Sequence, residues 1–203
     1  MFAIGCLVSS AALRIGVVGA HGGLGRELVQ QSLLRGHTPI AFARRRDPIL
    51  SPVRRGWLSP EGGEDETPMN VTCVSADVDP LPDVDAIVFA VSGRPFEADT
   101  STSTVWHVCS HLPETCRAVT LVSAWGVGES INESNAGIRA MRGVYLRSTY
   151  ASKEEQERLV SSLEGVEVRI LRPKVLSYSV IPLNTIATPR RTLAKRILDE
   201  LEE

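Results

Sequence analysis

Short apolar runs recur along the chain, separated by stretches whose apolar residues follow the helical period. The runs are rich in β-branched residues and show no polar alternation, which is typical of strands buried on both faces of a parallel sheet. The runs predicted as strands are 14–20, 38–43, 71–76, 85–91, 118–123 and 166–171. The segments predicted as helices are 25–35, 102–111, 150–163 and 192–201. This alternation predicts an α/β fold with a doubly wound parallel sheet and right-handed crossovers.

One connection departs from the alternation. Residues 47–70 contain four prolines and an acidic stretch but no helical or strand period. We interpret this segment as a flexible surface loop with one helical turn around Trp57. Little chain follows the last predicted strand, so we expect a single domain over 1–203 with a minimal C-terminal substrate region. Residues 1–12 are interpreted as an N-terminal extension.

The composition argues against some classes of partner but does not indicate a function. The 203 residues are 43% hydrophobic and 23% charged, with a net charge of −2. This balance argues against a nucleic-acid or membrane partner and leaves a small-molecule substrate and a monomer or dimer. The apolar N-terminus lacks a basic region and is too short to span a membrane. A cytoplasmic protein is expected, or one of an organelle stroma or matrix if the N-terminus is a trimmed targeting segment.

The cysteines and histidines do not form a metal-binding pattern. The cysteines lie at positions 6, 73, 109 and 116, without C-x-x-C spacing and without a histidine at zinc-ligand spacing. We interpret them as small hydrophobic residues of a protein in a reducing compartment. His107 and His111 share a helical face, but no third ligand accompanies them, so no metal site is expected.

A glycine-rich turn follows the first predicted strand and opens the first predicted helix. Gly19, Gly22 and Gly25 have the G-x-x-G-x-x-G spacing that permits a tight turn, a close approach of phosphate and close helix–strand packing. A pyrophosphate would lie on the exposed N–H groups of the helix. The turn therefore predicts a dinucleotide site in a Rossmann-type fold. The residues expected at the pyrophosphate are Gly19, His21, Gly22, Gly23, Leu24 and Gly25.

The end of the second strand bears on the choice of dinucleotide. NAD-specific domains usually carry a carboxylate there, which binds the ribose hydroxyls. This chain instead has Arg44, Arg45 and Arg46 before the first acidic residue. Guanidinium groups match a 2′-phosphate in shape and charge, so Arg44 and Arg45 predict NADP(H) in preference to NAD(H). The alternative is a solvated basic patch at the start of a loop.

The ends of the third and fourth strands complete the predicted cofactor site. Asp77, with Val78 beside it, could reach the adenine amino group, although a surface turn residue is an equal interpretation. Ala90, Val91 and Ser92 are small residues that would leave space for the ribose and the nicotinamide. Open α/β sheets bind their ligands at this edge.

Four residues further along are candidates for the nicotinamide end. Ser123 ends the fifth strand and could orient a substrate carbonyl, while Lys153 could hold the ribose hydroxyls and lower the pKa of a neighbouring acid. Tyr150 lies on the same side of the helix as Lys153, and Pro173 ends the sixth strand. The alternatives are a plain strand-end serine, a tyrosine without a chemical role, and a solvated lysine paired with Glu157.

Taken in order, these segments resemble the atypical short-chain dehydrogenase/reductase family, in its NmrA-like NAD(P)H-binding group. The chain is similar there to the small flavin reductase and biliverdin-IXβ reductase proteins. RIGVVGAHGGLG resembles the G-A-T-G-x-x-G turn, AFARR the second strand end, and SADV the G-D-V segment. The family's fourth strand is resembled by DAIVFAVSG, and its fifth-strand serine segment by TLVSAWGVG. Its lysine helix, with the strand and R-P that follow, is resembled by KEEQERLVSSLEGVEVRILRP. The resemblance implies that Arg44 contacts a 2′-phosphate and that Asp77, Ser123, Lys153 and Pro173 line the site.

The chain departs from the family pattern at the catalytic tyrosine. The major dehydrogenases carry Y-x-x-x-K, whereas here Tyr150 precedes Lys153 by three residues and Tyr145 precedes it by eight. The resemblance implies an NADPH-dependent oxidoreductase that passes hydride to a small planar or carbonyl acceptor, flavins included. A non-catalytic NADPH-binding regulator or assembly factor is the alternative. A methyltransferase is a further one, opposed by the arginines after the second strand.

Overall fold

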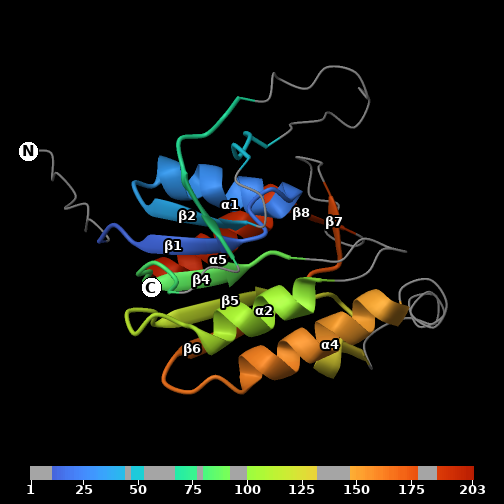
Figure 1. The fold of residues 1–203 in the computed structure, drawn as a ribbon. Helices are drawn as coiled ribbons and strands as arrows, with labels where there is room; N and C mark the ends of the chain where they lie inside the picture. Colours follow the sequence, from blue (N-terminus) through green and yellow to red (C-terminus); the bar gives the residue numbers. More distant parts are fainter. Residues whose placement is uncertain are drawn as a thin grey trace, which may run out of the picture.

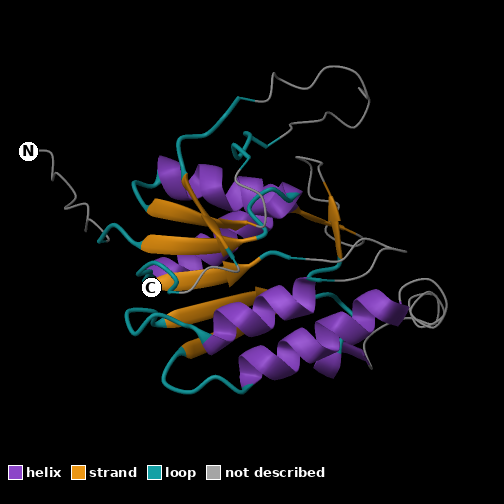
Figure 2. Cartoon of the chain, viewed as in Figure 1, coloured by secondary structure: helices purple, strands orange, loops and turns teal. Residues whose placement is uncertain are grey.

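The computed structural model describes residues 11–43, 47–52, 67–76, 80–91, 100–131, 147–177 and 187–203. Within these residues, six parallel strands form one sheet in the order β3-β2-β1-β4-β5-β6 (Figures 1 and 2). The strands are β1 Arg14–Val18, β2 Thr38–Ala43, β3 Thr72–Ser75, β4 Ala86–Phe89, β5 Ala118–Val122 and β6 Glu167–Leu171. The prediction of a Rossmann-type doubly wound parallel sheet is confirmed, with every predicted strand present.

Helices cover both faces of the sheet. Helices α1 (Gly23–Leu34) and α5 (Arg190–Glu202) lie on one face, and α2 (Ser101–Ser110) and α4 (Arg147–Ser161) lie on the other (Figure 1). A short 3₁₀ helix, η1 (Gly128–Ile131), follows β5. Gly36 has a φ of +80°, the left-handed conformation that glycine adopts readily just after a helix. The four helices predicted from the sequence are thus confirmed.

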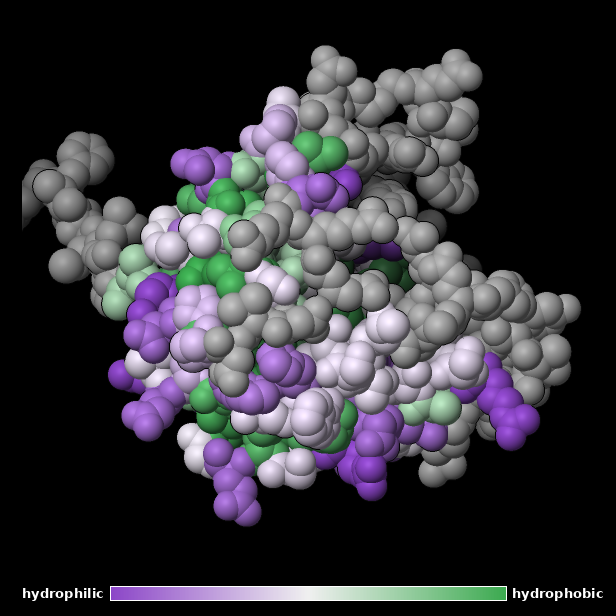
Figure 3. Space-filling view, in the orientation of Figure 1, coloured by the Kyte–Doolittle hydropathy of each residue, from purple (hydrophilic) through white to green (hydrophobic). Residues whose placement is uncertain are grey.

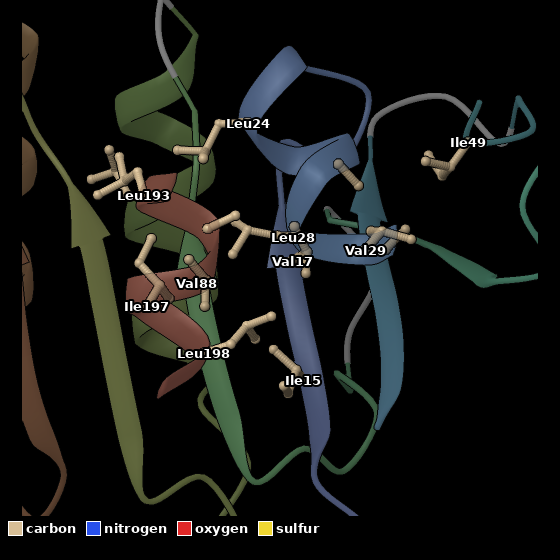
Figure 4. Packing of buried hydrophobic residues seen from close by; sticks show 14 residues of the cluster. Ile15, Val17, Leu24, Leu28, Val29, Ile49, Val88, Leu193, Ile197 and Leu198 are labelled. Carbon is tan, nitrogen blue, oxygen red and sulfur yellow. The ribbon is translucent and has the colours of Figure 1, made fainter. Parts of the chain in front are cut away.

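The sheet separates two hydrophobic cores in the described part of the chain. Ile15, Val17 and Leu28 pack with Leu198 on the side of α1 and α5 (Figure 4). Val18 and Phe89 belong to the other core, which includes Val105 of α2 and Val160 of α4. Neighbouring residues of β1 therefore point into different cores. This explains why the strands are apolar throughout rather than alternating.

The strand order places a topological switch point between β1 and β4. From β1 the chain continues outward to β2 and β3, and then returns to β4 on the other side of β1. The connections after β1 and β4 consequently leave toward opposite faces. Such a switch point opens a ligand crevice at the carboxyl ends of the two strands. The glycine turn follows directly after β1 at this edge.

The structure shows two features that the sequence pattern did not predict. In the connection from β2 to β3, Ile49 is fully buried, and Leu50 forms an antiparallel bridge with Pro68. The ends of the expected loop are thus held together, whereas the turn expected around Trp57 and residues 1–10 lie outside the described residues. Strands β7 (Val175–Ser177) and β8 (Ala187–Pro189) form a small parallel pair that the sequence analysis did not predict.

On the face shown in Figure 3, the described residues form separate hydrophobic patches among hydrophilic and intermediate ones. Among the described helices, none is both long enough and apolar enough to cross a membrane.

Candidate functional site

The glycine turn requires glycine at two positions. Gly19 has a φ of +88°, and a Cβ atom there would lie 2.8 Å from the carbonyl oxygen of Ala90. A Cβ atom on Gly25 would overlap the carbonyl oxygen of Gly19 and the Cα atom of Ala20. Both obstacles are backbone atoms, so no side-chain rotation could relieve them. The turn therefore packs α1 closely against β1 and β4, as the sequence analysis expected.

The N-terminus of α1 presents donors for an anion. The N–H of Gly22 donates to the carbonyl of Gly19 at 2.9 Å, and the N–H of Arg26 makes the first helical bond to Gly22 at 2.9 Å. The intervening N–H groups, of Gly23, Leu24 and Gly25, belong to the first turn, which a helix leaves without main-chain acceptors. No acidic side chain lies in that turn, and no side chain caps it. This end of α1 thus suits a pyrophosphate.

Two side chains frame the turn. His21 Nε2 lies 3.1 Å from the carbonyl oxygen of Asp47, which follows β2. The Nε–H of Arg26 donates to the carbonyl oxygen of His21 at 3.1 Å. The sequence analysis missed Arg26, although a basic residue directly after the third glycine of the turn was a signal that could have identified it.

The predicted residues at the ends of β2, β3 and β4 are only partly described. Arg44, Arg45, Asp77, Val78 and Ser92 lie outside the described residues. Ala90 and Val91 are described and extend β4 toward the turn. The N–H of Ala90 donates to the carbonyl of Val18 at 2.9 Å, which holds this segment beside the end of β1. The structure therefore brings Ala90 and the glycine turn together.

Lys153 is a buried cation that joins two strand ends. Lys153 is only 4% exposed. Its Nζ atom donates to the carbonyl of Val91 at 2.5 Å and to the carbonyl of Val122 at 2.9 Å. Nζ also donates to Gln156 Oε1 at 3.1 Å. The amide of Gln156 in turn donates to Ser101 Oγ at 2.7 Å. Lys153 thus connects α4, the ends of β4 and β5, and the start of α2.

The alternative of a solvated Lys153 paired with Glu157 is wrong. The carboxylate of Glu157 accepts two hydrogen bonds from Arg172, at 3.0 and 2.9 Å. The Arg172 guanidinium also lies 3.4 Å from Glu129, and these ion pairs raise its pKa although burial opposes them. Glu157 therefore attaches α4 to the end of β6 rather than to Lys153.

Ser123 has a buried hydroxyl group at the end of β5. The residue is 6% exposed, and Oγ finds no hydrogen-bond partner among the described residues. Its N–H donates to Leu171 at 2.8 Å, so the backbone is fixed against β6. Buried polar groups are nearly always hydrogen-bonded, and an unsatisfied one points to a functional role. The adjacent carbonyl, of Val122, is the one that Lys153 binds.

Tyr150 and Pro173 hold the loop after β5. The hydroxyl of Tyr150 donates to the carbonyl of Trp125 at 3.0 Å, and the N–H of Trp125 donates to the carbonyl of Pro173 at 2.9 Å. Lys174 Nζ lies 5.4 Å from the centroid of the Trp125 ring. The described contact of the Tyr150 hydroxyl is thus to the loop main chain. These bonds fix the main chain of Trp125, two residues after Ser123.

The described cysteines and histidines offer no alternative centre. Burial raises the pKa of Cys109 to about 12 and that of Cys116 to about 11, so both are neutral thiols at physiological pH. The rings of His107 and His111 are tilted by 34° to each other, with centroids 4.5 Å apart. Within the described ranges, no three metal-ligating side chains cluster.

The strand order, the glycine turn and the helix behind it define a nucleotide-binding domain of Rossmann type. A family model described as NAD(P)H-binding matches residues 19–193, and the chain belongs to this NAD(P)H-binding family. The match supports a nicotinamide dinucleotide as cofactor and gives no support to the methyltransferase alternative. No curated protein matches the sequence.

Solved structures with similar folds include proteins named as reductases or as NAD-dependent enzymes. The anaerobillin reductase ChuY of Escherichia coli O157:H7 is 17% identical, with a TM-score of 0.63 over 92% of this chain and 89% of its own. SP1627 of Streptococcus pneumoniae, assigned as an NADH-flavin reductase, is 14% identical, with 0.62 over 94% and 93%. An assigned NAD-dependent epimerase/dehydratase of Bacillus halodurans is 18% identical, with 0.63 over 95% and 89%. At these identities the likeness shows the fold.

The described residues fit the dinucleotide that the family binds. No side chain caps the first turn of α1, and its N–H groups can donate to phosphate oxygens. Ala90 and Val91 place small side chains after the end of β4. At the end of β5, the buried hydroxyl of Ser123 has no hydrogen-bond partner among the described residues.

Proposed function

We propose that the protein is an NADPH-dependent oxidoreductase of the atypical short-chain dehydrogenase/reductase type that reduces a small planar or carbonyl acceptor, flavin-like ones included. The observation that carries this proposal is the buried hydroxyl of Ser123 at the carboxyl edge of the sheet, which has no hydrogen-bond partner among the described residues. A hydroxyl left unsatisfied in the protein can donate to an oxygen of a bound substrate. Family membership and the reductases among the similar structures support the same reaction class.

Each end of the crevice has a separate task in this proposal. NADPH, when bound, supplies the hydride. The main chain from Gly22 to Gly25 holds the pyrophosphate, Arg44 and Arg45 hold the 2′-phosphate, and Asp77 with Val78 contacts the adenine half. Ala90, Val91 and Ser92 leave room for the ribose and nicotinamide.

Ser123 and Lys153 act at the acceptor end. The Ser123 hydroxyl donates to the acceptor oxygen, where negative charge grows as hydride is added. The Lys153 ammonium binds the neighbouring Val122 carbonyl at 2.9 Å and is almost fully buried, so its positive charge acts there in a low-dielectric environment. Positioning and these fixed charges would supply most of the rate effect.

The direct test is steady-state oxidation of NADPH by the full chain with a panel of flavin, quinone and carbonyl acceptors. We expect turnover with at least one planar acceptor and a much lower rate with NADH. Tight NADPH binding without turnover across the panel would contradict an enzyme.

That outcome would favour the second candidate, a non-catalytic NADPH-binding regulator or assembly factor. A specific observation supports it. The Tyr150 hydroxyl is bound to the Trp125 carbonyl, and the Lys153 ammonium is bound to protein acceptors, so their described contacts are structural. The binding and turnover measurements together separate the two functions.

A further inference from the structure

The main chain at the end of β6 holds the segment that contains Ser123. The N–H of Ser123 donates to the carbonyl of Leu171 at 2.8 Å, and the N–H of Trp125 donates to the carbonyl of Pro173 at 2.9 Å. Arg172 lies between these two acceptors in the chain. The position of Ser123 therefore depends on the position of this strand end.

The side chain of Arg172 attaches the same strand end to α4. Its Nε and Nη2 groups donate to the two carboxylate oxygens of Glu157, at 3.0 and 2.9 Å. The side chain of Glu157 is 9% exposed and that of Arg172 is 21% exposed, so solvent screens the pair only weakly. Paired hydrogen bonds between a guanidinium and a carboxylate fix the relative orientation of both groups as well as their distance.

The loop after β5 packs directly against this ion pair. A Cβ atom on Gly128 would overlap Glu157 Oε2 and would lie 3.0 Å from Arg172 Nη2, so the loop approaches this closely only because Gly128 has no side chain. The next residue, Glu129, places a carboxylate oxygen 3.4 Å from Arg172 Nη1. The loop, α4 and the end of β6 thus meet at one ion pair.

Helix α4 also binds the loop through Tyr150, whose hydroxyl donates to the carbonyl of Trp125 at 3.0 Å. The Arg172–Glu157 ion pair fixes the two elements that hold this loop, α4 and β6, relative to each other. The hydroxyl of Ser123 has no hydrogen-bond partner of its own among the described residues. Within the described structure, its place is therefore set by the main chain and by the elements that hold it.

We propose that Arg172 and Glu157 are positioning residues, which hold the main chain of Ser123 and Trp125 so that the Ser123 hydroxyl meets the acceptor. The proposal rests on the oxidoreductase function proposed above. A displacement of about 1 Å in a positioned group can lower a rate by roughly a hundredfold. The glycine turn belongs to β1 and α1, outside this arrangement. Loss of the ion pair should therefore lower kcat and leave cofactor binding unchanged.

The first measurement is steady-state oxidation of NADPH by the full chain with its best acceptor. We expect Arg172→Met to lower kcat at least about tenfold and to change KM for NADPH less than about twofold. Arg172→Lys keeps the charge without the paired geometry and should give an intermediate kcat. Adding Glu157→Gln to Arg172→Met should lower kcat no further, because the two side chains act as a unit. Arg158→Met breaks an ion pair with Glu155 on the outer side of the same helix and should change neither constant.

The second measurement reports on the loop without turnover. When Trp57→Phe and Trp106→Phe are combined, Trp125 is the one tryptophan left in the sequence. In this background, we expect Arg172→Met to raise the acrylamide quenching constant of Trp125 at least about twofold, because the loop opens more often. Arg158→Met should leave the quenching constant unchanged. Isothermal titration with NADPH should give the same Kd for both variants and for the unmodified protein.

Each result decides the proposal. An unchanged kcat in folded Arg172→Met overturns it, and so does an unchanged quenching constant or an equal loss of kcat and of NADPH affinity. If the methionine variant fails to fold, Arg172→Lys and Glu157→Gln decide by the same readouts. An unmodified protein that binds NADPH without turnover refutes the oxidoreductase function and the proposal with it. An active unmodified protein whose variants keep their kcat refutes the positioning role alone.

Discussion

Two buried serines near the end of β5 differ in their hydrogen bonds. Ser130 Oγ accepts from the N–H of Gly126 at 2.9 Å and donates to the carbonyl of Val127 at 2.8 Å. Ser123 Oγ, equally buried, has no partner among the described residues. Leaving a buried polar group unsatisfied costs about 1–3 kcal/mol. A site residue can carry such a cost when the ligand supplies the missing partner.

These two residues form a matched test. We expect Ser123→Ala to raise the free energy of unfolding of the unliganded protein by roughly 1 kcal/mol, and to lower kcat/KM for the best acceptor by roughly tenfold. Ser130→Ala should lower the free energy of unfolding by about 1 kcal/mol, because it removes the hydrogen bonds of Ser130 Oγ with the N–H of Gly126 and the carbonyl of Val127. Urea unfolding and initial-rate measurements provide the readouts. Similar destabilisation by both substitutions would contradict a ligand-binding role for Ser123.

At the scale of elements, the C-terminal helix is attached to α1 by a group of ionic contacts. Arg35 binds Asp199 at 2.8 Å and Glu202 at 2.9 Å. His37 Nε2 lies 2.8 Å from Glu202, while Nδ1 accepts the N–H of Leu13 at 3.3 Å. This arrangement anchors the last helix to the first strand and helix. It lies at the edge of the sheet away from the cofactor crevice.

These contacts predict a loss of stability in acid. The hydrogen bond from Lys195 lowers the pKa of Asp199. Burial raises the pKa of Glu202, but the bonds from Arg35 and His37 outweigh it and bring the net pKa below its ordinary value of 4.5. Carboxyls with a lowered pKa stabilise the fold above that ordinary value and lose the effect as pH falls below it.

We therefore expect the free energy of unfolding to fall from about pH 4.5 toward pH 3, and expect Glu202→Gln to have a shallower slope there than the unmodified protein. Urea unfolding at a series of pH values measures both. Glu164→Gln, at an exposed position, is the control and should keep the original slope. An unchanged slope in Glu202→Gln would show that this contact does not contribute.

The main elements were predictable because each carries its own signal. The strands buried on both faces are continuous apolar runs, and the helices carry a stripe of apolar residues. β7 and β8 are too short for any pattern, with three residues each. The burial of Ile49 was also hidden, because one apolar residue among prolines has no period. Ile49 belongs to the core that includes Leu28 and Val29, and the local sequence does not encode such distant contacts.

At the scale of the whole molecule, cofactor binding should appear as stabilisation of the folded state. NADPH at a hundred times its Kd should stabilise the chain by about 2.7 kcal/mol, which corresponds to roughly 5–10 °C in melting temperature. NADH at the same concentration and tenfold weaker affinity should give about 1.4 kcal/mol. A variant combining Arg44→Ala and Arg45→Ala should give equal shifts with the two cofactors. Equal shifts in the unmodified protein would refute the argument from the arginines.

The sequence by itself determined the sheet, the helices and the glycine turn, because these depend on local period and on backbone freedom at single positions such as Gly19 and Gly25. It also selected Ser123 and Lys153 from their places at a strand end and on a helix. Only the tertiary structure decided what those side chains contact. Lys153 binds the carbonyls of Val91 and Val122, 62 and 31 residues away, and the Ser123 hydroxyl has no partner in the part of the chain that the structure describes. Such contacts join segments distant along the chain, so they exist only once the strands have been ordered in the sheet.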